Sequence, residues 1–138
     1  MTRRRIRENI FCILFNLEFH SEEEFDEQFL MYIEGIDDEP SEDETEEIRN
    51  KVLAIRDKLP EIDPIIEASA EKWKIGRIGK ADLTILRLAV YEMLYDDTVP
   101  MKVAINEAVE LAKLYGMNDK PSFINGVLSK VADDHVEE

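Results

Sequence analysis

A strongly apolar stretch runs from about Lys80 to Tyr95 and constrains the fold more than any other segment. Drawn as a helix, this stretch is apolar over more than one face, which is typical of a helix covered by other helices. Such a helix needs neighbours that bury it on several sides. We therefore expect residues 80–95 to lie at the centre of a helical fold.

Apolar residues recur at helical spacing in the other segments, and strand patterns are nearly absent. Pro60 is expected to end one helix, and Asp63 followed by Pro64 is a typical start of the next. The last two helices are expected over about 102–115 and 122–132, with a frayed acidic tail behind them. The sequence predicts an all-α bundle of about seven helices. We expect one domain over residues 1–138, with possible subdomains at about 1–60 and 61–138 that share a core.

Start signals support this reading of the first half of the chain. Thr2 can cap the first helix, and Ser21 and Ser41 each stand three residues before a glutamate in a capping-box pattern. Near the other end, Gly126 interrupts the last helix, where glycine costs about 1 kcal/mol relative to alanine. Close approach of another helix would explain that glycine.

Charge is distributed very unevenly. The net charge is −15, and 15 of the 32 acidic residues lie between Glu18 and Ile48, a stretch without lysine or arginine. The remaining 17 acidic residues equal the 17 lysines and arginines in number. The chain is thus a neutral body with one acidic flank, which weakens non-specific binding to nucleic acid.

A basic cluster lies at the opposite extreme of this pattern. Arg3, Arg4, Arg5 and Arg7 open the first helix. Guanidinium groups present planar donors to phosphates, and the helix dipole favours an anion at the same end. Two interpretations stay open: the arginines bind phosphate, or they pair with the protein's own acidic residues.

Signatures of catalysis are scarce. The sequence contains no glycine-rich phosphate loop, nucleophile elbow or dinucleotide fingerprint. His20 and Glu24 alone make a weak metal-binding pair, and Cys12 is expected to be a buried structural thiol. Arg87 and Glu92, within apolar stretches, are expected to form a structural network between helices. We predict a binding module that is not an enzyme and that uses no cofactor or metal.

No stretch of the sequence is typical of a membrane span or a secretory signal. Cys12 is the single cysteine, so an internal disulfide is impossible. These features predict a protein that works in a reducing cytoplasm.

Four segments resemble the family of the bacterial transcription antitermination factor NusB. They are Arg-Arg-Arg-x-Arg-Glu at 3–8, Ile-Leu-Arg-Leu-Ala-Val-Tyr-Glu at 85–92, Val-Ala-Ile-Asn-Glu-Ala-Val-Glu-Leu-Ala-Lys at 103–113 and Phe-Ile-Asn-Gly-Val-Leu at 123–128. Their order and spacing agree with the family, whereas residues 21–47 match only as generic helix and loop. The resemblance implies an all-helical fold of two small subdomains.

The resemblance also implies a function. NusB-like proteins bind boxA RNA in nascent transcripts together with NusE, a small-subunit ribosomal protein. The complex joins RNA polymerase and other Nus factors, which lets polymerase read through terminators in ribosomal RNA operons. The sequence leaves open whether the chain also forms a homodimer.

Site residues can be carried over by position. The family's RNA-contacting motif corresponds to Arg3, Arg4, Arg5 and Arg7. A second RNA contact near the loop before the last helix corresponds to Asp119, Lys120 and Phe123. Phe123 either stacks on a base or packs into the core. The side facing NusE would include Phe15 and Asp82.

The acidic flank departs from what an RNA-binding protein requires, so we expect it to point away from the RNA. The partner would then supply much of the binding. NusB-like domains also occur fused to ribosomal RNA methyltransferases, but this chain has no room for a cofactor-binding domain beside the NusB-like region. The alternative function is a helical protein-interaction module without RNA binding.

Overall fold

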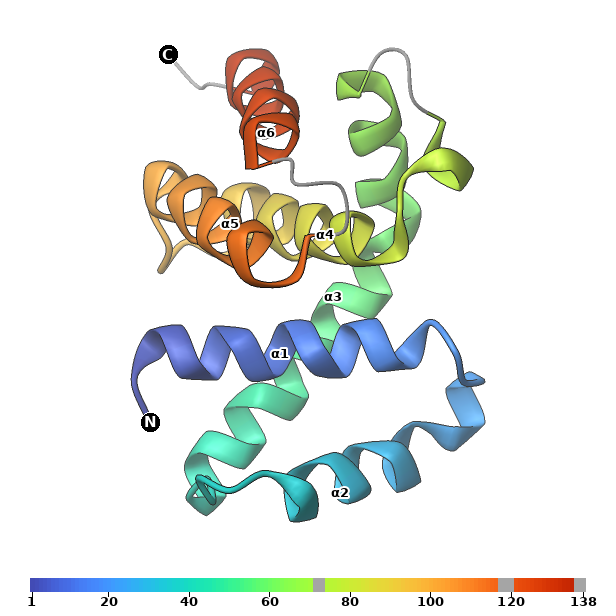
Figure 1. Ribbon diagram of the computed structural model, residues 1–138, viewed down its shortest axis with the longest axis vertical. Coiled ribbons are helices and arrows are strands. Elements are labelled where there is room, and N and C mark those ends of the chain that lie inside the picture. The colour runs from blue at the N-terminus through green and yellow to red at the C-terminus, as the bar shows by residue number, and fades with distance from the viewer. Residues whose placement is uncertain (71–73, 117–120, 136–138) are drawn as a thin grey trace. The chain divides into compact units, whose positions relative to one another are not determined.

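The computed structural model describes residues 1–70, 74–116 and 121–135 (Figure 1). Within these ranges the chain forms six α-helices, two short 3₁₀ helices and no β-strand, which confirms the all-α class. The α-helices are α1 (Arg3–Leu17), α2 (Phe25–Gly35), α3 (Glu42–Ser69), α4 (Lys80–Tyr95), α5 (Met101–Tyr115) and α6 (Pro121–His135). The 3₁₀ helices are η1 (Glu22–Glu24) and η2 (Ile75–Arg77).

The chain divides into two compact units, Met1–Arg56 and Asp57–Glu138. Unit 1 contains α1, α2 and the first part of α3, and unit 2 contains the remainder of α3 with α4, α5 and α6. That the whole chain acts as one domain with a shared core stays a prediction. No described helix has both the length and the hydropathy needed to cross a membrane.

α3 is a single helix where the sequence predicted two. Pro60 and Pro64 both lie inside it, and each lacks the N–H that would bond the carbonyl four residues earlier, which costs about 3 kcal/mol in a helix interior. Ile62 and Ile66 are fully buried, and burying such a side chain is worth roughly 1.5–3 kcal/mol. Both prolines are exposed, so water can hydrate the carbonyls that lose their donors. Burial of the apolar face therefore keeps α3 helical at both prolines.

α4 lies at the centre of unit 2, as its composition predicted. It packs against α5 and α6, which also pack against each other. The buried residues of α4 cover most of its circumference: Ala81, Asp82, Leu83, Thr84, Ile85, Leu86, Leu88, Ala89, Val90, Glu92 and Met93. A helix buried to this extent is stabilised chiefly by its neighbours.

Arg87 carries the predicted polar link out of α4. Its Nε and Nη2 donate to the two carboxylate oxygens of Asp63 on α3, at 2.9 and 2.8 Å. Both side chains are largely buried, and two parallel bonds of this kind are the strong form of an ion pair. The prediction of a network between helices is confirmed for this pair.

Reciprocal capping organises unit 1. Thr2 Oγ1 accepts a hydrogen bond from the Arg5 backbone N–H at 3.0 Å. Glu44 accepts from the Ser41 N–H at 2.9 Å, while Ser41 Oγ accepts from the Glu44 N–H at 3.1 Å. These caps fix where α1 and α3 begin. The core of unit 1 is formed by Ile6, Ile10, Phe11, Ile13, Leu14, Phe25, Phe29, Ile48, Val52 and Ile55.

Two expectations for α6 are wrong. Gly126 is exposed, and among the described residues a Cβ built on it would have no atom of another segment within 4 Å, so no described helix approaches it closely. The helix also continues to His135, beyond the predicted end near Ala132. His135 Nδ1 lies 2.9 Å from the Val131 carbonyl oxygen, and this contact occupies a carbonyl in the last turn.

Replacing Asp63 with alanine removes both carboxylate contacts of Arg87 and should lower the free energy of unfolding by about 1–3 kcal/mol. Urea unfolding followed by circular dichroism measures this loss. Asp57→Ala is the matched control, because Asp57 is exposed on the same helix and should change stability by less than about 0.5 kcal/mol. Equal losses in the two variants would contradict a stabilising role for the Arg87–Asp63 pair.

Gly126→Ala should raise the free energy of unfolding by about 1 kcal/mol, because the added methyl meets nothing and alanine favours the helix. Gly116→Ala is the opposing control: its Cβ would lie 2.6 Å from the Ala112 carbonyl oxygen and 3.3 Å from Asp82 Oδ1. That variant should lose stability in thermal unfolding. A destabilised Gly126→Ala would refute the open surroundings of Gly126.

Candidate nucleic-acid interface

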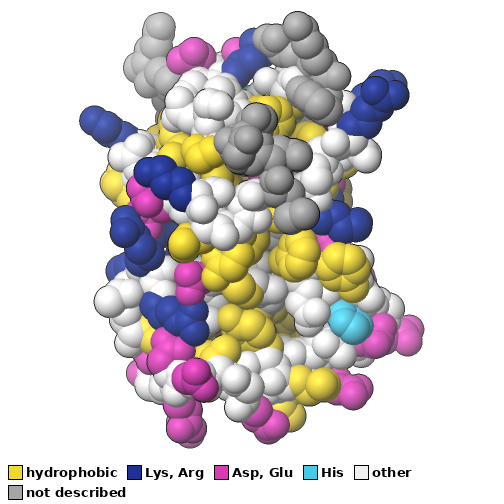
Figure 2. Space-filling view, viewed as in Figure 1, with side chains coloured by type: hydrophobic (Ala, Val, Ile, Leu, Met, Phe, Trp, Pro, Cys, Tyr) yellow, Lys and Arg dark blue, Asp and Glu magenta, His cyan; other side chains and the backbone are white. Residues whose placement is uncertain are grey.

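The four predicted arginines occupy the first two turns of α1. Arg3 and Arg4 are exposed, and Arg5 and Arg7 are half-buried. Figure 2 shows Lys and Arg side chains beside Asp and Glu side chains along the lower left edge, the side on which α1 begins in Figure 1. The basic cluster is therefore bordered by acidic groups.

Arg5 is held by two carboxylates. Its Nε and Nη2 donate to Asp38 at 2.7 and 2.8 Å, and its Nη1 donates to Glu8. The hydrogen bonds from Arg5 lower the pKa of Asp38 to about 2. The same contact with Asp38 raises the pKa of the Arg5 guanidinium further above its ordinary value. Both groups stay charged at neutral pH.

Arg3 is paired in the same way with the start of α3. Its Nη2 donates to Glu47 Oε1 at 3.0 Å, and its Nη1 contacts the other oxygen. The N-terminal ammonium donates to Glu44 at 2.6 Å, and this contact lowers the pKa of Glu44. Arg4 and Arg7 also take part in interactions.

The acidic segment 37–47 thus lies against the arginine cluster, and the expectation that the acidic flank points away from the RNA stays a prediction. The chain leaves α2, turns at the buried Pro40 and enters α3 beside the start of α1. Opposite charges within one unit attract each other at this point. Pairing with the protein's own acids, one of the two open interpretations, holds for Arg3 and Arg5. Sequence periodicity could not have identified Asp38 and Glu47, since their partners lie 33 and 44 residues away.

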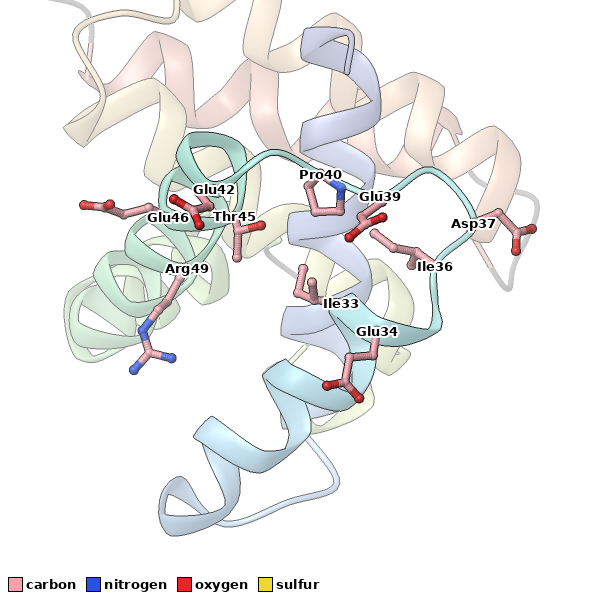
Figure 3. Close-up of a pocket in the computed structure, with 10 residues that line it drawn as sticks. All are labelled: Ile33, Glu34, Ile36, Asp37, Glu39, Pro40, Glu42, Thr45, Glu46 and Arg49. Atoms are coloured by element: carbon pink, nitrogen blue, oxygen red, sulfur yellow. The ribbon is translucent and has the colours of Figure 1, made fainter.

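The same segment borders a groove of about 640 Å³ within unit 1 (Figure 3). Its lining combines apolar and acidic side chains with one arginine: Ile33, Glu34, Ile36, Asp37, Glu39, Pro40, Glu42, Thr45, Glu46 and Arg49. Five carboxylates against one guanidinium make this groove unfavourable for a phosphate backbone. The RNA-binding prediction therefore depends on the arginines and not on this groove.

The second predicted RNA contact is described only in part. Phe123 is half-buried near the start of α6 and has an interaction partner. Asp119 and Lys120 lie outside the described residues. The arginine cluster belongs to unit 1 and Phe123 to unit 2.

The two predicted partner contacts differ in exposure. Phe15 is half-buried and contacts the Phe11 ring and the Phe19 ring at centroid distances of 6.2 and 5.3 Å. Phe19 is 57% exposed, and sequence reasoning missed it although it follows Phe15 by one helical turn. Asp82 is only 3% exposed, and this burial raises the pKa of its carboxyl.

The structure also describes the other side chains that the sequence singled out for possible chemistry, Cys12, His20 and Glu24. Cys12 is half-buried, whereas the sequence predicted a buried structural thiol. His20 Nδ1 lies 3.5 Å from Glu24 Oε2. Within the described ranges, no three His, Cys, Asp or Glu side chains are grouped so that they could hold a metal ion.

Acid should weaken unit 1. The pKa values of Asp38, Glu44 and Glu24 are lowered in the folded chain, so these groups contribute stability above their unfolded pKa of about 4 and lose it as the pH falls through the folded values. Thermal unfolding from about pH 6 to about pH 2 should show a falling midpoint. The fall should be shallower in Asp38→Asn, and an identical profile would exclude a contribution of Asp38.

Comparisons with known proteins show the family of this chain. A family model described as the NusB family matches residues 4–133. The transcription antitermination protein NusB of Lachnoclostridium phytofermentans is 48% identical over 133 residues, which cover 96% of this chain and 100% of the relative.

Solved structures give the same assignment. NusB of T. maritima has a TM-score of 0.83 at 34% identity, with 99% of this chain and 94% of that chain covered. A chain in a crystal structure of antitermination factors NusB and NusE in complex with dsRNA has a TM-score of 0.80 at 27% identity, with coverage of 98% and 100%. The resemblance noted in the sequence is confirmed, and the chain belongs to the NusB family.

Proposed function

We propose that this protein is a transcription antitermination factor that binds boxA RNA in nascent ribosomal RNA operon transcripts. It does so together with a NusE-type ribosomal protein and joins the antitermination complex of RNA polymerase with other Nus factors. The observation that carries the proposal is the arginine-rich start of α1 in a chain that belongs to the NusB family along nearly its whole length. A related structure contains NusB, NusE and dsRNA together.

In the proposed mechanism, contacts to the RNA backbone are separate from recognition of the bases. Arg3, Arg4, Arg5 and Arg7 hold the RNA backbone through hydrogen bonds from guanidinium to phosphate, which carry no sequence information. Phe123 stacks on a base, and the neighbouring Asp119 and Lys120 contact the same RNA. Base edges are read on the composite surface that the protein makes with its partner.

The NusE-type partner is proposed to contact Phe15 and Asp82. The Phe15 ring lies beside the exposed Phe19 ring, and a partner that covers both gains apolar contact area. Asp82 offers little surface for direct contact because it is almost fully buried. A homodimer that uses apolar helix faces stays a separate prediction.

The proposed activity is binding without catalysis. Antitermination by assembly requires a surface that joins RNA and protein, and no cofactor enters that mechanism. Because nascent transcripts are its target, the proposed location is the cytoplasm.

Two observations favour the alternative function, a helical interaction module without RNA binding. Arg3 and Arg5 already have carboxylate partners, and the chain carries a net charge of −15. A protein with this net charge repels phosphate groups, so RNA binding requires additional binding energy from the partner. The two functions differ in whether the partner-bound protein holds RNA.

Titration of fluorescent boxA RNA with the protein, with and without the NusE-type partner and at two salt concentrations, tests the proposal. Binding should strengthen with the partner and weaken with salt, at a log–log slope of roughly −3 for four phosphate contacts to a single strand. A duplex form of the same RNA shows whether pairing of the bases matters. If the protein retains its partner but binds no RNA, the interaction module is the correct function.

Charge reversal at Arg4 or Arg7 should reduce RNA affinity by about tenfold or more, since a phosphate contact becomes a repulsion. Partner binding should stay unchanged in pull-down or calorimetry. Lys113→Glu is the matched control because Lys113 is exposed in unit 2 and pairs with Glu110 of its own helix. A loss as large in Lys113→Glu would show that net charge alone, and not the arginine cluster, controls binding.

A further inference from the structure

We propose that Asp38 and Glu47 are intramolecular competitors of RNA, whose carboxylates occupy the guanidinium groups of Arg5 and Arg3 until phosphates displace them. This autoinhibitory contact rests on the proposed function, because it regulates the arginine cluster assigned above to RNA. It assigns a role to the acidic segment 37–47 that neither the family resemblance nor the sequence pattern provides.

The geometry of the contact matches the geometry of the ligand it would exclude. Asp38 receives two nearly equal hydrogen bonds from Arg5, at 2.7 and 2.8 Å. Arg3 likewise donates hydrogen bonds to both carboxylate oxygens of Glu47. A phosphate group uses the same two-donor edge of a guanidinium. One edge cannot serve a carboxylate and a phosphate at once, so a phosphate that binds Arg3 or Arg5 through this edge must displace the carboxylate.

The acidic segment is held in place by contacts that do not involve these two arginines. The N-terminal ammonium donates to Glu44 Oε2 at 2.6 Å, and Glu44 Oε1 accepts from the Ser41 N–H at 2.9 Å. Pro40 is buried between α2 and α3. Asp38 and Glu47 lie on either side of these anchors, so their carboxylates are kept at high local concentration beside the arginines.

The competition is weak enough to be reversed. Side-chain exposure is 70% for Arg3 and 46% for Asp38, and ion pairs at such positions change an equilibrium by about two- to fivefold each. An RNA strand with several phosphates, assisted by a protein partner, can overcome two such pairs. A short or isolated anion gains less, since each new contact replaces an existing one.

The acidic segment also provides matched control residues. Asp37 precedes Asp38, and Glu46 precedes Glu47, so neutralising either pair changes the charge equally at nearly the same place. In the described part of the chain neither control residue is ion-paired with an arginine. Figure 3 shows the Asp37 and Glu46 side chains pointing outward from opposite sides of the groove.

The test compares RNA affinity between Asp38→Asn/Glu47→Gln and the control Asp37→Asn/Glu46→Gln, with circular dichroism confirming that both fold. Two RNAs of equal length are titrated, boxA and oligo-uridine, each with and without the NusE-type partner. The competitor variant should bind both RNAs about four- to twenty-fivefold more tightly than the wild type. The control should gain less than about twofold, through its weaker long-range charge effect.

Equal gains on the two RNAs are essential, because the competition acts on phosphate contacts and not on bases. A gain confined to boxA would mean that the carboxylates take part in base reading, and this overturns the proposal. Gains no larger than those of the control also overturn it, while the proposed function survives because the wild type still binds RNA. If no variant binds either RNA even with the partner present, the proposed function itself fails.

A readout without RNA tests the contact directly. Phenylglyoxal modifies accessible arginine side chains, and mass spectrometry reports the rate at each position. Arg3 and Arg5 should react faster in Asp38→Asn/Glu47→Gln than in the wild type, and at the wild-type rate in the control variant. Unchanged rates at both arginines would show that the carboxylates do not shield them, which overturns the proposal independently of RNA.

Discussion

The guanidinium groups at the start of α1 require anions, and unit 1 supplies those anions itself. Asp38 and Glu47 pair with Arg5 and Arg3, and Glu44 takes the N-terminal ammonium. These contacts join the start of α1 to the turn after α2 and to the first two turns of α3. The most acidic part of the chain and its most basic part are therefore one structural feature. Acidic and basic residues that are separated along the sequence therefore neutralise each other in the folded unit.

Hydrophobic burial determines the helices that this electrostatic contact joins. Ile55, Ile62 and Ile66 are fully buried along α3, and their burial offsets the two missing backbone hydrogen bonds at Pro60 and Pro64. Local start and stop signals are weak terms compared with such burial. The same principle explains α4, where the apolar surface extends around most of the helix and Arg87 is compensated by Asp63.

Periodicity and capping predicted the helices that have one dominant signal. The limits of α4 match the prediction, and the caps at Thr2, Ser21 and Ser41 form as expected. Two of the failures share a cause, since each depends on contacts between distant positions. The continuity of α3 depends on what its buried face meets, and the open space at Gly126 depends on where other helices lie. The sequence pattern contains neither the contacts of the buried face of α3 nor the positions of the helices around Gly126.

The candidate site was predictable to the same extent. The arginines were identifiable because four guanidinium groups within five residues are rare and have a clear chemistry, whereas their partners were hidden among 15 acids of similar appearance. Only the folded chain distinguishes Asp38 from Asp37. This distinction changes the meaning of the net charge: part of the acidic flank is not a repulsive background that RNA must avoid but a ligand already bound at the site. The protein's own carboxylates limit the affinity of the arginine cluster for phosphate, which reduces non-specific binding to RNA. Contacts with the correct partner then restore the affinity.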